Sequence, residues 1–248
     1  MSEAEPNLEP VLPERYPFWS YGDLALFIGL SLPSLILGAL LVRVFVWAFH
    51  IDVGITAAEL LSAQFTGYGF LFLALYLILR LHYNRPFWRS LGWVQAPIRP
   101  LTLVLLGFVL AFLVAAAGTL LRTPDLNSPL KQLLSDPASA ALVAAFAITL
   151  GPLCEELAFR GFMQPLLVRS LGPVLGIVVT ALPFGLLHLQ QNAFSWRHGL
   201  LITLAGVAFG WIRHLSGSTK AATIMHAAYN STFFILFLMQ KKIAPPPW

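Results

Sequence analysis

Charged side chains and cysteines are scarce in this 248-residue chain. Only 10% of its residues are charged, whereas soluble proteins average about 25%. Hydrophobic residues make up 58%, and the mean hydropathy is +0.76. An ordinary soluble domain cannot bury so much apolar surface, so the composition excludes that class and indicates a chain surrounded partly by lipid. Cys154 is the one cysteine, which excludes an intrachain disulfide.

The net charge is small, at +4. In a membrane protein such an excess informs orientation rather than nucleic-acid binding, so we expect the lipid bilayer as a partner and no nucleic acid. An antiparallel arrangement of the apolar windows puts eight Lys and Arg residues on one face and six on the other, which favours a cytoplasmic N-terminus. We find no internal repeat of the kind that many transporters contain.

Apolar windows predict an all-α fold, a polytopic transmembrane helix bundle of about seven (seven to eight) spans. A spanning helix needs about 20 residues, so the fifth and sixth windows are short and the fourth is long. All seven tryptophans lie near window ends, as interfacial anchors do. The windows run approximately over residues 24–49, 60–79, 101–121, 138–167, 174–189, 200–212 and 221–239.

Three charged residues interrupt the fourth window. An ionisable side chain at the centre of a spanning helix costs about 2.5–3.5 kcal/mol on the insertion scale. Glu156 and Arg160 are spaced i, i+4 with the acid first, which is the favoured order for an ion pair. Glu155 lies about 100° round the helix from Glu156, so we expect it to point elsewhere, with no local cation.

Further polar residues lie in the fifth and seventh windows. If windows four and five form an antiparallel pair, Glu155 and His188 lie at the same depth, about 24–26 Å from the turn. His226 and Asn230 share one helix face at i, i+4 spacing. A packed histidine, an interhelical asparagine and a structural ion pair would explain each feature singly. Together they favour a functional site at one depth.

This set of residues suits the hydrolysis of an amide bond by an activated water. Glu155 has the profile of a general base, and His188 could share a water with it. His226 and Asn230 are possible donors on one face, as an oxyanion hole needs. Cys154 and Ser231 are poor nucleophiles because neither has a clear adjacent base.

Three motifs in the same order resemble those of the CPBP intramembrane proteases. This family includes type II CAAX prenyl endopeptidases and bacterial abortive-infection and bacteriocin-processing relatives. EELAFR (residues 155–160) fits EExxxR, FGLLH (184–188) fits FxxxH, and HAAYN (226–230) fits HxxxN. The resemblance covers about residues 138–240.

The resemblance implies an intramembrane endopeptidase that acts on a membrane-associated protein or peptide. It implies that Glu155 and His188 activate the water and that His226 and Asn230 form the oxyanion hole. The supporting residues would be Glu156, Arg160 and Phe184. We therefore divide the chain into a polar N-terminal tail (1–23), N-terminal transmembrane helices (24–137), a catalytic transmembrane core (138–240) and a C-terminal tail (241–248).

Cofactor use and the function class leave alternatives open. Glu155, His188 and His226 are a plausible zinc ligand set with an open position. We favour a mechanism without a cofactor, because HExxH is absent and Asn230 suits an oxyanion better than a metal. The alternatives to a protease are a transporter or proton relay, and a silent scaffold that binds a membrane partner. We expect a multi-pass protein in the plasma membrane of a prokaryote.

Overall fold

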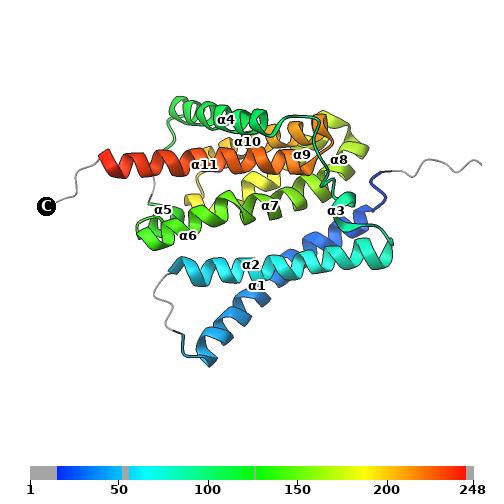
Figure 1. Cartoon of the computed structure of the whole chain (residues 1–248), viewed down its shortest axis with the longest axis horizontal. Helices are drawn as coiled ribbons and strands as arrows, with labels where there is room; N and C mark the ends of the chain where they lie inside the picture. Colours follow the sequence, from blue (N-terminus) through cyan, green and yellow to red (C-terminus); the bar gives the residue numbers. More distant parts are fainter. Residues whose placement is uncertain (1–15, 52–55, 126, 244–248) are drawn as a thin grey trace, which may run out of the picture.

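The computed structural model describes residues 16–51, 56–125 and 127–243 (Figure 1). Every regular element in these ranges is a helix, which confirms the predicted all-α membrane bundle. Each predicted apolar window falls mainly on helical residues, and the fifth window runs two residues past the end of its helix at Leu187. The elements are α1 (Tyr21–Ala48), α2 (Thr56–Leu77), η1 (Ile78–His82), α3 (Phe87–Ser90), α4 (Pro100–Leu120), α5 (Pro129–Leu133), α6 (Pro137–Ile148), α7 (Leu150–Glu156), η2 (Leu157–Met163), α8 (Gln164–Leu171), α9 (Pro173–Leu187), η3 (Gln190–Asn192), α10 (Trp196–Ser216) and α11 (Thr219–Ile243).

Five helical stretches in the described part of the chain are long and apolar enough to cross a membrane. α9 is apolar but shorter. Large apolar side chains on these stretches face outward, such as Leu120 with 84% of its surface exposed, and lipid is the solvent that such a surface suits. The chain is therefore a multi-pass integral membrane protein. The five stretches are Tyr21–Ala48, Ala57–His82, Pro100–Leu120, Pro137–Leu171 and Trp196–Ser216.

The α1–α2 hairpin lies on one side of α6 and α7, and α4, α10 and α11 lie on the other (Figure 1). Small residues allow the closest helix approaches. A side chain on Gly38 of α1 would place its Cβ 2.6 Å from the Ala63 carbonyl oxygen of α2. Helices in lipid associate through van der Waals packing of this kind, because lipid tails supply no hydrophobic driving force between them.

The stretch 137–171 is broken rather than a single straight helix. α6 ends at Ile148, and Thr149 leaves the helical region with φ −120° and ψ −84°. Pro152 explains the break, since proline offers no N–H to the carbonyl of residue i−4, which is Ile148, and its ring clashes with that carbonyl. The π-helical segment η2 then follows α7. Such π-bulges are frequent at functional sites.

The segment Tyr16–Ser20 packs against the bundle ahead of α1. Trp19 is 1% exposed, its Nε1 donates to the Phe162 carbonyl oxygen at 3.1 Å, and the two rings stack with centroids 5.2 Å apart. The prediction that Trp19 is an interfacial anchor is therefore wrong, because this indole is sealed in the core. Within the predicted N-terminal tail, Pro17 and Trp19 are buried and Tyr21 already begins α1, and residues 1–15 lie outside the described residues. The predicted C-terminal tail overlaps the last turn of α11, and residues 244–248 are likewise outside.

One end of the bundle, which we call the basic end, gathers arginine and lysine residues. The ends of α2, α8 and α10, the short α3 and the starts of α4 and α11 all lie at this end (Figure 1). This arrangement agrees with the grouping of cations predicted from the alternation of the windows. The described members of this group are Arg80, Arg85, Arg89, Arg99, Arg169, Arg213 and Lys220.

Candidate active site

The predicted ion pair between Glu156 and Arg160 is confirmed. Arg160 Nη1 donates to Glu156 Oε1 at 2.9 Å, and both side chains are fully buried. The guanidinium also lies over the Phe184 ring, 4.5 Å from its centroid. A buried charge is tolerated only where it is paired and hydrogen-bonded, and these contacts meet that condition for Arg160.

His226, on α11, contacts the same Glu156 carboxylate. Its Nδ1 lies 2.9 Å from Glu156 Oε1, and its ring stacks on Phe209 with centroids 4.5 Å apart and planes inclined by 17°. Because Glu156 is paired with a guanidinium, its carboxylate acts as an acceptor, so we assign the proton to Nδ1 of His226. In a neutral ring, Nε2 then presents its lone pair to the other side.

Glu155 lies on that other side of the His226 ring. Its side chain is 20% exposed, and Oε2 lies 3.8 Å from His226 Nε2. The prediction that Glu155 points away from Glu156 agrees with this geometry, and a histidine from α11 lies where no local cation was expected. The two adjacent carboxylates thus occupy different surroundings, since Glu156 is sealed and Glu155 is partly accessible.

His188 lies close to this group without a direct contact to either glutamate. It caps the C-terminus of α9, and its Nδ1 lies 2.7 Å from the Phe184 carbonyl oxygen. The Phe184 ring is 4.7 Å from the His188 ring and 5.8 Å from the His226 ring, measured between centroids. The buried phenyl group therefore contacts both imidazoles, and His188 joins the cluster through it.

Asn230 lies one helical turn beyond His226 and makes a different contact. Its Nδ2 donates to the Ala147 carbonyl oxygen at 2.7 Å. Ala147 is in the last turn of α6, just ahead of the break at Thr149. Asn230 therefore faces the same broken helix as His226 but hydrogen-bonds to its backbone, and it connects α11 to α6.

Residues that the motifs did not point to complete the surroundings of the ion pair. Arg160 Nη2 donates to the Gly206 carbonyl oxygen at 2.8 Å, and Gln164 Nε2 donates to the Gly210 carbonyl oxygen at 2.9 Å. Gly206 and Gly210 have the small-xxx-small spacing that indicates close helix packing. Polar residues at 156, 160 and 164, four apart in an apolar helix, are the sequence signal that could have identified Gln164.

The zinc ligands suggested from the sequence are Glu155, His188 and His226. Within residues 16–51, 56–125 and 127–243, no three His, Cys, Asp or Glu side chains come together as a metal-binding group. His226 Nδ1 is engaged by Glu156, and His188 Nδ1 by the Phe184 carbonyl oxygen. A histidine that ligates a metal through Nε2 commonly donates its Nδ1–H to a carboxylate or a backbone carbonyl, so these contacts leave the Nε2 atom of each ring open.

An apolar pocket of about 660 Å³ lies beside Cys154, the residue before Glu155. α2, the segment 86–88 and α7 enclose it, and Arg80 also lines it. Most of its lining is aromatic or aliphatic, so it suits an apolar chain or side chain. The lining includes Phe72, Tyr76, Phe87, Trp88, Leu153, Cys154 and Leu157.

The sequence comparison agrees with the three motifs. Residues 137–232 match the sequence model of the family described as type II CAAX prenyl endopeptidase Rce1-like. This region is similar to the Rce1-like family. The Rce1-like region contains every candidate site residue from Glu155 to Asn230 and indicates a CAAX-type intramembrane peptidase. Neither a search of curated proteins nor a search of solved structures finds a match.

Proposed function

We propose that the protein is an intramembrane endopeptidase that hydrolyses a peptide bond of a membrane-associated protein or peptide. One observation carries this proposal: the Glu155 carboxylate, in a helical stretch long and apolar enough to cross a membrane, lies 3.8 Å from His226 Nε2. That separation is too long for a hydrogen bond, so both groups keep polar atoms available for a reacting water and substrate.

Glu155 is the proposed general base. It accepts a proton from a water whose oxygen attacks the carbonyl carbon of the scissile bond. The resulting tetrahedral oxyanion collapses, the C–N bond breaks, and the proton held by Glu155 passes to the leaving amine. His188, which caps α9 next to the same cluster, orients the water.

His226 and Asn230 are the proposed oxyanion donors, and the contacts they make set conditions on that role. With Nδ1–H directed at Glu156, His226 can donate from Nε2 only as the imidazolium, a charge that Glu156 and Glu155 would stabilise. Asn230 would exchange its bond to the Ala147 carbonyl oxygen for one to the oxyanion. Charge that develops in the transition state would favour both changes.

Glu156, Arg160 and Phe184 are the proposed supporting residues. Glu156 fixes the orientation of His226 and is itself held by Arg160. Phe184 lies against both imidazole rings and under the guanidinium. We propose no cofactor, and we propose that the apolar pocket beside Cys154 receives an apolar part of the substrate.

The test compares Glu155→Gln with the control Glu59→Gln, the same change in the first turn of α2. Membrane proteomes of cells that express the wild type, Glu155→Gln or Glu59→Gln are searched for new peptide ends, and the cleaved peptides are then offered to the purified proteins in detergent. We expect wild type and Glu59→Gln to cleave and Glu155→Gln to lose nearly all cleavage at normal yield. Identical peptide ends with and without Glu155 would overturn the proposal. Glu155-dependent uptake of a solute into vesicles without any cleavage would favour a transporter instead.

The prokaryotic plasma membrane stays a prediction that follows from the resemblance to bacterial relatives. Fractionation of the source cells, with the protein detected by antibody, tests it.

A further inference from the structure

α2 carries a pair of polar side chains, Gln64 and Tyr68, that the three motifs did not point to. They are one helical turn apart in the stretch Ala57–His82, which is long and apolar enough to cross a membrane. Tyrosine is enriched at membrane interfaces, whereas Tyr68 lies near the middle of this stretch. Both side chains are half-buried. Because polar side chains inside a helix bundle usually bond to partners within it, this pair indicates a role inside the bundle.

Tyr68 packs against the broken helix that carries Glu155. Its ring lies 6.5 Å from the Phe146 ring, measured between centroids, with the planes inclined by 26°. Phe146 in turn folds over Gly151 of α7, where a Cβ would lie 3.6 Å from two atoms of the phenyl ring. Glu155 is one helical turn beyond Gly151, and residues four apart share one helix face. Tyr68 therefore approaches the face of α7 that carries Glu155.

Two further observations place Tyr68 beside Glu155. The Tyr68 hydroxyl lies within electrostatic range of the Glu155 carboxylate and of the Cys154 thiol. The apolar pocket is lined by Gly69 and Phe72 from α2 and by Cys154 from α7. The neighbours of Tyr68 and of Glu155 thus border one space, so α2 and α7 meet at the level of the candidate active site.

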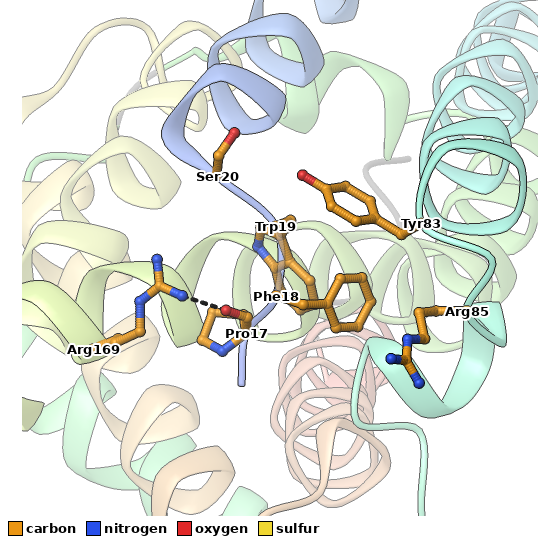
Figure 2. A pocket seen from close by; sticks show the side chains of 7 residues that line it. All are labelled: Pro17, Phe18, Trp19, Ser20, Tyr83, Arg85 and Arg169. Carbon is orange, nitrogen blue, oxygen red and sulfur yellow. Dashed lines mark hydrogen bonds between the residues drawn. The ribbon is translucent and has the colours of Figure 1, made fainter. Parts of the chain in front are cut away.

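The segment ahead of α1 holds the α1–α2 hairpin against the stretch 137–171. Figure 2 shows Pro17 and Trp19 among the helices, with Arg169 of α8 directed at the Pro17 carbonyl oxygen. Trp19 Nε1 donates to the Phe162 carbonyl oxygen of η2, and the two rings stack. Phe27 of α1 contacts the Phe162 ring as well, at 5.2 Å between centroids. These contacts hold α2 in place beside the candidate active site.

The Tyr68 hydroxyl has a proton available for a hydrogen bond. Gln64 Nε2 donates to its oxygen at 2.8 Å, and a phenolic hydroxyl is a donor as well as an acceptor. Within residues 16–51, 56–125 and 127–243, no acceptor takes the hydroxyl proton. Asn230 Nδ2, by contrast, is already bonded to the Ala147 carbonyl oxygen. Tyr68 can therefore donate to a substrate without first giving up another bond.

We propose that Tyr68 is a further catalytic residue, whose hydroxyl donates a hydrogen bond to the carbonyl oxygen of the scissile peptide bond. This inference rests on the proposed peptidase function. As the water oxygen attacks and its proton passes to Glu155, negative charge moves onto that carbonyl oxygen. Tyrosine hydroxyls are among the groups that stabilise such an oxyanion. Tyr68 keeps its own proton throughout, and Gln64 is a positioning residue that orients the hydroxyl.

The test is steady-state kinetics of Tyr68→Phe on the peptides that the wild type cleaves. This variant keeps the ring that packs on Phe146 and removes only the hydroxyl. We expect kcat of the folded protein to fall about 10²-fold or more with KM little altered, because the bond strengthens in the transition state. The matched control is Tyr21→Phe, the same change at an exposed tyrosine of the same hairpin. It should cleave as the wild type does.

Gln64→Met distinguishes an orienting amide from one that only packs. We expect it to lower kcat, but less than Tyr68→Phe does. The double variant Gln64→Met/Tyr68→Phe should lose no more kcat than Tyr68→Phe alone, because the amide acts through the hydroxyl. If Tyr68→Phe does not fold, an unchanged kcat in Gln64→Met would itself overturn the inference.

The unfolding temperature of each variant in detergent is recorded beside its kinetics. A wild-type kcat in the folded fraction of Tyr68→Phe, whatever its unfolding temperature, would make Tyr68 a packing residue only. A raised KM at unchanged kcat would also overturn the inference, since that pattern indicates ground-state binding. The peptidase function would survive both results as long as the wild type cleaves and Glu155→Gln does not. Absence of cleavage by the wild type would overturn that function and this inference together.

Discussion

Arg160 Nη2 donates to the carbonyl oxygen of Gly206 at a distance of 2.8 Å, across the contact between η2 and α10. Gly206 has no side chain, and a Cβ there would lie 3.1 Å from that nitrogen and 3.0 Å from Phe184 Cδ1. The glycine therefore gives the guanidinium access to a backbone carbonyl that would otherwise be covered. The buried guanidinium thus owes one of its hydrogen bonds to a residue 46 positions away in the sequence.

Gly206→Ala should destabilise the fold, because the added methyl group pushes against the guanidinium and Phe184. Overpacking of this kind costs about 1–3 kcal/mol, and thermal unfolding in detergent measures it. The matched control is Gly29→Ala in α1, where a Cβ would meet nothing within 4 Å. An unfolding temperature for Gly206→Ala that equals that of Gly29→Ala would show that the contact adapts without cost.

Glu156→Gln should lower stability more than any other conservative change in the site. It leaves the fully buried Arg160 without a counter-charge, and breaking a buried pair in this way costs about 3–5 kcal/mol. Chemical or thermal unfolding of the purified variant gives the value. Glu59→Gln, in the first turn of α2, is the control and should cost no more than about 1 kcal/mol. Equal losses in the two variants would mean that the ion pair adds nothing to stability.

Asn230→Ala separates a catalytic role from a purely connecting one. Loss of the bond to the Ala147 carbonyl oxygen should cost about 0.6–2 kcal/mol of stability. If Asn230 is an oxyanion donor, the variant should also lose about 10²–10³-fold in kcat, with KM little altered. Steady-state kinetics on the folded fraction measures both parameters. Ser231→Ala, which removes only a bond within α11 to the Ala227 carbonyl oxygen, is the control, and an unchanged kcat in Asn230→Ala would leave that residue a connection between α11 and α6.

Chelation should leave activity nearly intact if Glu155 and His188 activate the water without a metal. Elemental analysis of the purified protein should then find well under one zinc per chain. Stoichiometric zinc that is lost together with activity and restored by re-addition would contradict this. It would also make ligands of His188, His226 and a glutamate.

Much of the architecture could be predicted from the sequence alone, because it depends on residues that are close together along the chain. The apolar windows predicted the long helices, because a chain in lipid must satisfy its backbone hydrogen bonds within each segment. The pair between Glu156 and Arg160 was predictable for a similar reason, since residues four apart in a helix are neighbours whatever surrounds them. The helix break at Thr149 also has a local cause, Pro152. The continuous apolar pattern of the window nevertheless led us to predict one unbroken helix there.

The tertiary structure alone decided which distant groups meet. No spacing rule indicates that His226 lies between Glu155 and Glu156, that Asn230 reaches Ala147, or that the Gly206 carbonyl accepts from Arg160. These contacts depend on how far each helix is rotated about its axis, and packing against neighbouring helices fixes that rotation. Trp19 makes the same point, because its position at the end of an apolar window suggested a headgroup anchor, whereas the docking of its segment on Phe162 buries it.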